Sequence, residues 1–422
     1  MRFLHLADIH LDTLFHGRSR YLRERLRQAV FSALSRGVDV ALDEEVDALL
    51  LAGDLFDGER LSFKSERLLA RELDRLAQAR IPVFYATGNH DPGQGTAERG
   101  RIHWPEHVTV FDGPGPRTVE VHRGSRLVGR ITGAGHATPG ESRDLSRSFP
   151  AGDAPGDRVP AAALLHTQVG GARSEERHEP YAPSELSHLV SSGYDYWALG
   201  HVHQRQMLSR VPGVHYPGNI QGRNPRETGP KGGLLVELVP GGGEPGVEFV
   251  ELAPIRWETL RVTGLEDVRH LDGLIRKVSQ AWREERSQDP GRPGTEWVVR
   301  VEVGGPTHLH RELRRSEDLE TLEVELTSRL EVLHTEVRAG GIRPKVDPAP
   351  LLERQDPVGE AIRLVRALAD GEEDPLAELG IDPAELAAVE GEDRDVVRRY
   401  VEELLASGDQ ELAARFMDEE KS

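Results

Sequence analysis

The chain has 422 residues, of which 30% are charged and 37% hydrophobic, a balance typical of a globular protein with two or three domains. No stretch approaches the ~20 consecutive apolar residues that a membrane helix needs, and the lack of cysteine excludes disulfides and thiolate metal sites. His and Asp interrupt the N-terminal MRFLHLADIHLD too early for a signal peptide, so we expect a cytoplasmic protein with no membrane association.

The net charge of -19 is unevenly distributed along the chain. Residues 341–422 contain 10 Lys and Arg against 22 Asp and Glu, a net charge of -12, which leaves -7 for residues 1–340. The body is therefore only mildly acidic, and composition neither excludes nor supports a polyanionic partner such as nucleic acid.

Short apolar runs alternate with helical patterns from residue 1 to about 255, which predicts a layered α/β core. The runs predict strands at 2–7, 46–52, 81–87, 163–166, 194–200, 233–239 and 247–253. Leucines at helical spacing predict helices around 22–34 and 69–76. The segments 133–160 and 170–183 are rich in loop-forming residues and predict loops.

The pattern changes at about residue 256 and predicts a small α+β domain. The segment RWETLRVTG is followed by a charged helical pattern at 267–286, a turn, the alternating strand at 297–303, a further helix-like stretch and the segment EVLHTEV at 331–337. Three prolines between 344 and 350 mark a linker, and helical patterns at 358–370 and 396–407 follow in an acidic tail. We therefore expect three parts, 1–255, 256–342 and 343–422.

Groups that can bind metal ions follow five of the predicted strands. They are Asp8 with His10, Gly53-Asp54, Gly88-Asn89-His90-Asp91, His166, and Gly200-His201-x-His203. Ligands bind at the carboxyl ends of strands in open α/β sheets, so these five ends could converge on one site. Carboxylate, amide and imidazole groups suit manganese, iron or zinc. Two such ions can hold the attacking and leaving oxygens of a displacement at phosphorus.

Each block alone has a plainer interpretation. Asp54 could cap the following helix, GNHD could be a turn, and His166 could be a packed core histidine. The joint occurrence of five blocks, each after a predicted strand, favours the metal pair, with Asp54 as the bridging carboxylate. Gly53, Gly88 and Gly200 would let the backbone turn sharply beside the site.

The five blocks resemble those of the calcineurin-like metallophosphoesterases. The stretches LHLADIHLDTLF, YAPSEL, YDYWALGHVHQRQ and YPGNIQGRNPRETGPKG are similar to the SbcD/YhaO-type DNA repair exonucleases. The resemblance covers 1–255 well and 256–340 more loosely. It implies a layered core of two packed β-sheets flanked by helices, a small α+β capping domain, and a helical acidic tail.

The resemblance also implies a role for each residue of the blocks. Asp8, His10 and His203 would hold one divalent metal ion, usually Mn²⁺, while Asn89, His166 and His201 would hold the second and Asp54 would bridge them. His90 would act near the phosphate, as general acid or as a stabiliser of transition-state charge. We expect Asp57 to orient a ligand or His90, with a helix cap as the alternative, and Asp91 to support the ligands from behind.

Residues outside the blocks allow weaker predictions. The candidates for phosphate contact are Arg205, Arg223, Arg226 and Lys231, with ordinary solvation of their loops as the alternative. We interpret Tyr181 and Trp197 as core residues rather than base-stacking platforms, and His5 as a packed or orienting residue. His16, His136 and His215 receive no role.

The leading hypothesis is a manganese-dependent DNA exonuclease and endonuclease that acts in double-strand-break repair or end processing. The resemblance implies a homodimer that works with an SbcC-like SMC-type ATPase. A phosphomonoesterase or cyclic-nucleotide phosphodiesterase is the alternative, because the blocks specify phosphoester chemistry and not the leaving group. A non-catalytic scaffold that binds DNA or the ATPase is disfavoured, since every expected ligand is present.

Overall fold

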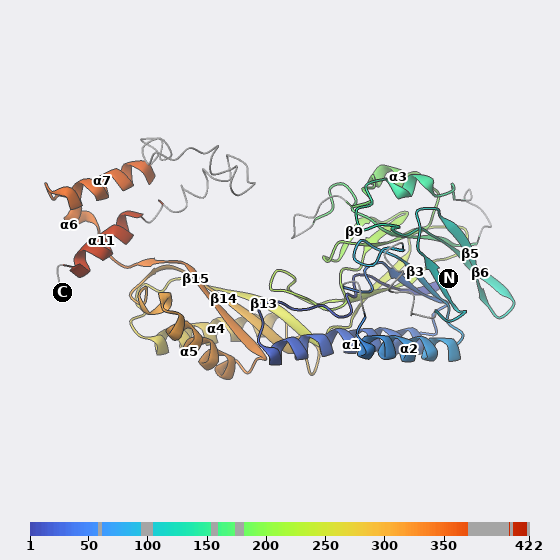
Figure 1. Cartoon of the computed structure of the whole chain (residues 1–422), viewed down its shortest axis with the longest axis horizontal. Helices are drawn as coiled ribbons and strands as arrows, with labels where there is room; N and C mark the ends of the chain where they lie inside the picture. The colour runs from blue at the N-terminus through green and yellow to red at the C-terminus, as the bar shows by residue number, and fades with distance from the viewer. Residues whose placement is uncertain are drawn as a thin grey trace. The chain divides into compact units, whose positions relative to one another are not determined.

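The computed structural model describes residues 1–57, 61–93, 104–152, 159–173, 181–369, 405 and 408–419. The chain divides into two compact units, Met1–Glu258 with Gly291–Val298, and Thr259–Pro290 with Val299–Ser422 (Figure 1). Most of the helical pattern predicted at 396–407, and parts of the loops predicted at 133–160 and 170–183, lie outside the described residues.

The first unit contains two six-stranded sheets. The first sheet has the order β12 (Gly246–Glu251), β11 (Gly232–Glu237), β1 (Arg2–Leu6), β2 (Ala48–Ala52), β3 (Val83–Ala86) and β4 (Val108–Phe111). The second has the order β5 (Arg117–Arg123), β6 (Arg126–Gly133), β7 (Ala161–His166), β8 (Tyr196–Gly200), β10 (Gly213–Tyr216) and β9 (Gln206–Ser209). β1 to β4 run parallel, as do β6, β7, β8 and β10, and the remaining pairs are antiparallel.

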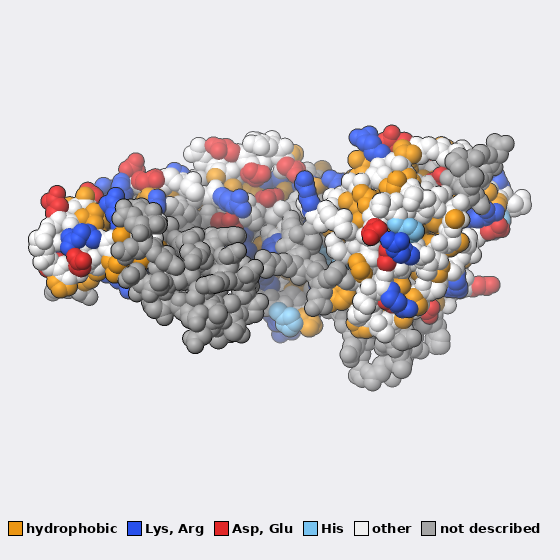
Figure 2. Space-filling view, turned by 90° about the horizontal axis from the view of Figure 1, so that it is seen from above, with side chains coloured by type: hydrophobic (Ala, Val, Ile, Leu, Met, Phe, Trp, Pro, Cys, Tyr) orange, Lys and Arg blue, Asp and Glu red, His pale blue; other side chains and the backbone are white. Residues whose placement is uncertain are grey.

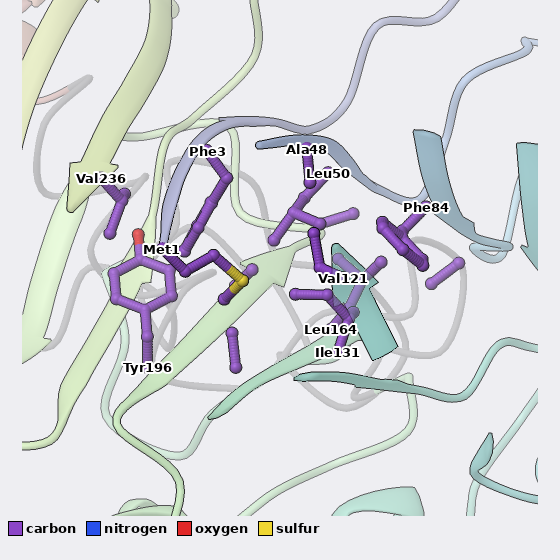
Figure 3. Packing of buried hydrophobic residues seen from close by; sticks show 14 of the residues in the cluster. Met1, Phe3, Ala48, Leu50, Phe84, Val121, Ile131, Leu164, Tyr196 and Val236 are labelled. Atoms are coloured by element: carbon purple, nitrogen blue, oxygen red, sulfur yellow. The ribbon is translucent and has the colours of Figure 1, made fainter. Parts of the chain in front are cut away.

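The two sheets pack face to face over one apolar core. Figure 3 shows Phe3, Leu50 and Phe84 of the first sheet facing side chains of the second, among them Leu164 and Tyr196. β2 reads ALLLA with every residue buried, because a strand covered on both faces needs apolar side chains on both.

Helices cover the outer faces of both sheets. α1 (Arg20–Asp43) contacts β1 and β11 and packs beside α2 (Phe63–Gln78) on the first sheet. On the second sheet, Leu189 of α3 (Leu186–Ser191) and Leu145 of the 3-10 helix η2 (Leu145–Ser148) join the cluster around Trp197. The predicted core of two packed β-sheets flanked by helices is confirmed.

The second unit is built on a three-stranded sheet of order β13 (Ile255–Val262), β14 (Glu296–Thr307) and β15 (His334–Pro344), of which β13 and β14 begin in the first unit. Its helices are α4 (Leu271–Gln288), α5 (Ser316–Arg329), α6 (Ala349–Leu352), α7 (Pro357–Ala369) and α11 (Gly408–Glu419), with the 3-10 helix η3 (Glu312–Arg314). Leu351, Ile362 and Ala413 form a small core between α6, α7 and α11. The predicted α+β pattern and helical segment of the tail are confirmed.

Two findings concern charge and membranes. On the face seen in Figure 2, Lys and Arg side chains are interspersed with Asp and Glu side chains. Within the described ranges, no helix is both long and apolar enough to cross a bilayer.

The strand predictions from apolar runs are confirmed, but other strands of the described residues were missed. In the first unit these are β4, β5, β6, β9 and β10. β5 reads RTVEVHR and is mostly exposed, and β9 and β10 have four residues each, so neither hydrophobicity nor length marked them. The helix-cap alternatives for Asp54 and Asp57 are wrong for α2, because Ser62 caps that helix and its side chain accepts from the Ser65 N–H.

Candidate metal centre

The five blocks lie at the carboxyl ends of β1, β2, β3, β7 and β8. The loops after β1 and β2 are joined by backbone hydrogen bonds, in which the Asp8 N–H donates to the Gly53 carbonyl at 3.1 Å and the His10 N–H donates to the Asp54 carbonyl at 2.9 Å. In the second sheet, β7 and β8 run parallel, so that His166 lies beside Gly200. The packing of the sheets therefore brings the blocks together, as the strand pattern predicted.

The backbone is strained at this cluster. Four of the seven candidate ligands have positive φ angles: Asp8 (51°), His10 (52°), Asp54 (49°) and His201 (106°). Residues other than glycine rarely adopt such angles, at a cost of about 1–3 kcal/mol each, and they do so mainly at functional sites. This concentration of strain is independent support for a functional site at the blocks.

Two glycines allow close contact between the loops. A Cβ atom on Gly53 would lie 2.2 Å from His166 Nδ1, and one on Gly88 would lie 2.2 Å from Asp54 Oδ1. Gly53 also has a φ of 86°, so a glycine is needed there both for the backbone conformation and for the close contact with His166. At Gly88 it is needed for the close contact with Asp54 alone. Any larger residue at either position would displace a candidate ligand.

Asp8, His10 and His203 form the first group of candidate ligands. Their ligand atoms lie within 4.8 Å of one another, with His10 Nε2 3.2 Å from His203 Nε2 and His203 Nε2 3.9 Å from Asp8 Oδ1. The backbone N–H of His201 donates to both oxygens of Asp8, which holds the carboxylate in place. These three residues could hold one ion.

The second group contains Asn89, His166 and His201. Asn89 Oδ1 lies 2.9 Å from His166 Nε2 and 3.2 Å from His201 Nδ1. Asp54 lies between the groups, with Oδ2 3.8 Å from His10 Nε2 and 3.5 Å from His166 Nε2. A carboxylate in this position could contact an ion in each group.

The protonation pattern of the second group fits a cation. His166 Nδ1 lies 2.9 Å from the Ala52 carbonyl, which can only accept, so this pattern assigns the proton to Nδ1 and a lone pair to Nε2. Burial lowers the pKa of His166 well below its usual value, which favours the neutral ring. The Nε2 lone pair then faces the carbonyl oxygen of Asn89, a contact between two acceptors that a metal ion would make favourable.

The acids of the cluster also fit metal ions. Burial, joined by repulsion from Asp54, raises the pKa of Asp8 to about 7. A carboxylate this deeply buried needs a compensating positive charge. His10 is fully buried with a lowered pKa, and its Nδ1 has no hydrogen-bond partner among the described residues. Carboxylates and neutral imidazoles are the donors that divalent metal ions take.

Glu227 is a site residue that the sequence analysis missed. Its Oε1 accepts from His203 Nδ1 at 2.9 Å, and its Oε2 accepts from Asn219 Nδ2 and from the Arg223 N–H, both at 2.6 Å. Burial alone would raise the pKa of Glu227, but His203 outweighs it and lowers the pKa to about 2. Carboxylates that orient metal-binding histidines are common, and this one directs His203 Nε2 towards His10. Its only signal in the sequence was an acid within the basic loop QGRNPRETGPKG.

His90 and Arg223 share the carboxylate of Asp57. His90 Nδ1 lies 3.0 Å from Asp57 Oδ1, while Arg223 Nη2 and Thr13 Oγ1 donate to Oδ2 at 3.0 and 2.9 Å. The hydrogen bond to Asp57 raises the pKa of His90, which favours the imidazolium form. Burial would raise the pKa of Asp57, but His90 and Arg223 outweigh it and lower the pKa to about 2. The His90 side chain is 41% exposed and can reach a bound substrate.

Asp91 joins the loops after β2 and β3. Its oxygens accept from the backbone N–H groups of Leu55, Phe56 and Gly88. Burial and repulsion from Asp54 raise the pKa of Asp91 to about 6. It therefore contacts the backbone of the ligand loops and not the ligand side chains.

The other basic candidates lie in different surroundings. Lys231 Nζ donates to the carbonyl of His203 at 3.0 Å, behind the H-x-H block. Arg226 is exposed on its loop. The guanidinium of Arg205 stacks on Phe249 at 3.7 Å from the ring centroid. Of the four predicted phosphate contacts, Arg223 donates to Asp57, the carboxylate that also bonds to His90.

The remaining aromatic and histidine residues divide between core and site. Trp197 is fully buried in the core, as predicted, and His215 stacks on Tyr196. His5 is packed, with hydrogen bonds to the Tyr196 hydroxyl and the Leu199 carbonyl. The ring of Tyr181, expected in the core, is only partly buried and lies 5.8 Å from that of His201. His136 Nε2 donates to the carbonyl of His166 at 2.8 Å and so supports a ligand strand, while His16 is exposed.

Comparison with known proteins matches both units. A family model described as calcineurin-like phosphoesterase matches residues 1–205, and one described as the middle domain of the metallophosphoesterase YhaO matches residues 257–340. An uncharacterized metallophosphoesterase YhaO of Bacillus subtilis is 34% identical over 293 residues, which span 68% of this chain and 69% of that protein.

Two more distant relatives carry names that refer to nucleases or DNA. The SbcD component of the nuclease SbcCD of Rhodobacter capsulatus is 29% identical over 272 residues, 51% of this chain and 62% of that protein. The DNA double-strand break repair protein Mre11 of Sulfurisphaera tokodaii is 37% identical over 90 residues, 21% of this chain and 22% of that protein.

Proposed function

The chain belongs to the calcineurin-like phosphoesterase family, a family of phosphoester hydrolases, and from this premise we propose that it is a nuclease that cleaves phosphodiester bonds in DNA with two Mn²⁺ ions. The observation that carries the proposal is the position of Asp54 between two groups of metal-binding side chains, next to the exposed edge of His90. Two metal ions held in this way could stabilise the attacking and the leaving oxygen in hydrolysis at phosphorus.

The roles of the ligands follow from the two groups. Asp8, His10 and His203 would hold one ion, Asn89, His166 and His201 the other, and Asp54 would bridge them. When bound, the ions would lower the pKa of a water molecule and polarise the phosphoryl oxygens. Glu227 and Asp91 would keep the side chains and loops in position.

His90 would act on the substrate itself. As an imidazolium it can donate a hydrogen bond to a phosphate oxygen, or a proton to the leaving oxygen. Asp57 bonds to its Nδ1 and favours its charged form. Arg223 lies on the other oxygen of Asp57 and would contact a phosphate.

DNA as substrate and the partners rest on the relatives. The component of the SbcCD nuclease and the protein named for double-strand break repair both support DNA, in contrast to a phosphomonoester or a cyclic nucleotide. We extend the proposal to a cytoplasmic homodimer that works with an SbcC-like SMC-type ATPase, in which residues 256–342 form a capping domain and 343–422 a separate tail.

A nuclease assay tests the proposal. The purified protein is given end-labelled duplex and single-stranded DNA, with and without Mn²⁺, beside Asp54→Ala, His90→Ala and His122→Ala. His122 is a matched control, because its side chain is 43% exposed, like that of His90, and pairs with Glu120 on β5. We expect Mn²⁺-dependent cleavage that Asp54→Ala abolishes, that His90→Ala lowers by roughly 10²–10⁴-fold, and that His122→Ala leaves intact. Turnover of a phosphomonoester or a cyclic nucleotide with no cleavage of DNA would refute it.

A further inference from the structure

A cavity of about 380 Å³ adjoins the metal centre on the side of Asp57 and Arg223. Residues 13–16, from the loop after β1, form one wall. Asp57, Arg223, Asn224 and Glu227 form the other. The cavity therefore shares Asp57 with His90 and Glu227 with His203, and it opens beside the place where a substrate phosphate would bind.

The two walls differ in chemistry. Leu14 is 54% exposed at the first wall, whereas Phe15, the next residue of the chain, is buried. On the second wall, Arg223 binds Asp57 through Nη2, and its side chain remains 21% exposed, so that the guanidinium can also donate to an anion in the cavity. The cavity is thus lined by an exposed leucine and by a guanidinium that is paired with Asp57 and lies near Glu227.

Hydrogen bonds hold both walls in place. The Leu11 N–H donates to the Leu55 carbonyl, and the Asp57 N–H donates to the Leu11 carbonyl, both at 2.9 Å. Thr13 is fixed by its own bond to Asp57 and by Arg27 Nε, which donates to its carbonyl at 3.1 Å. Two residues that line the cavity, Thr13 and Asp57, are therefore fixed to each other and to the loops after β1 and β2.

We propose that this cavity binds the nucleoside attached to the scissile phosphate, with the base against Leu14 and a phosphate oxygen on Arg223. The inference rests on the proposed function and specifies its substrate. A nucleotide is an anion joined to a flat ring of apolar faces, and so matches a guanidinium and an exposed leucine in one cavity. The volume lies near the lower end of the ~300–1,000 Å³ of small-ligand pockets, which suits one nucleoside rather than a base pair.

Two esters with the same leaving group test the proposal. Thymidine 5′-(p-nitrophenyl phosphate) carries a nucleoside, whereas methyl p-nitrophenyl phosphate carries only a methyl group in its place. We expect Leu14→Ser to lower kcat/KM for the thymidine ester about fivefold or more and to leave that for the methyl ester unchanged, and we expect Leu14→Phe to retain activity on both. Leu364→Ser is the matched control, because Leu364 is an exposed leucine on α7, outside the cavity.

Calorimetry separates the cavity from the proposed activity. The Mn²⁺-loaded protein should bind thymidine 5′-monophosphate more tightly than 2-deoxyribose 5-phosphate, and Leu14→Ser should abolish that difference. Equal affinity of the wild type for the two ligands, or equal effects of Leu14→Ser on both esters, would overturn the nucleoside site. If neither ester is hydrolysed, the proposed function fails, while the calorimetric comparison still decides whether the cavity binds a nucleoside.

Discussion

Gly53 lies between β2 and the metal centre, and replacing it by alanine should impair metal binding in addition to lowering the stability of the fold. Its φ of 86° costs an alanine about 1–2 kcal/mol relative to glycine. The added Cβ would also lie 2.2 Å from His166 Nδ1, so the ring would have to retreat by roughly 1 Å or more to reach an ordinary contact distance. That movement would break the hydrogen bond to Ala52 and misplace Nε2.

Gly124 provides the matched control for this substitution. It has a φ of 63° in the turn between β5 and β6, and a Cβ atom there would meet nothing within 4 Å. Urea denaturation of the metal-free proteins should show the backbone cost of about 1–2 kcal/mol for Gly124→Ala and a larger loss for Gly53→Ala, which also displaces the His166 ring. Gly53→Ala alone should weaken Mn²⁺ binding, by about 10–100-fold in isothermal titration calorimetry. Equal Mn²⁺ affinities for the two variants would refute the assignment of His166 as a ligand that Gly53 positions.

Three further predictions concern the charges of the site. Asp57→Asn should lower the pKa of His90, because the hydrogen bond to Asp57 is the main cause of the raised pKa. If the imidazolium is the active form, kcat on bis(p-nitrophenyl) phosphate decreases as His90 loses its proton. In Asp57→Asn this decrease should occur at a lower pH than in the wild type. Glu227→Ala should weaken Mn²⁺ binding by about 10–100-fold, since His203 loses its acceptor, whereas Glu227→Gln keeps an oxygen there and should retain most of the calorimetric affinity. In EDTA, the wild type should lose stability relative to Asp8→Asn as the pH rises from about 4 to about 7. The reason is that the pKa of Asp8 in the folded protein exceeds its usual value, so the fold favours the protonated carboxyl group. A difference in melting temperature between the two proteins that stays constant over this pH range would contradict the raised pKa.

The core strands and the candidate ligands could be predicted because local patterns encode them. An apolar run such as ALLLA indicates a buried strand wherever it pairs, and a polar block directly after it must lie at the carboxyl end of that strand. Asp8, Asp54 and His166 could therefore be selected without knowing which strands are neighbours. The exposed β5 and the four-residue β9 and β10 lacked this pattern, so their pairing in the second sheet was not predictable.

The contacts between the blocks and their surroundings were decided by the tertiary structure. Asp57 bonds to Arg223, which lies 166 positions away in the chain, and to Thr13, which lies 44 positions away. Glu227 meets His203 only because the loop before β11 folds back over the H-x-H block. The sequence alone determined which chemical groups stand at the strand ends, since those depend on neighbours along the chain. The packing of two sheets determined which groups share a proton, an ion pair or a cavity wall, since those depend on distances that no local pattern encodes.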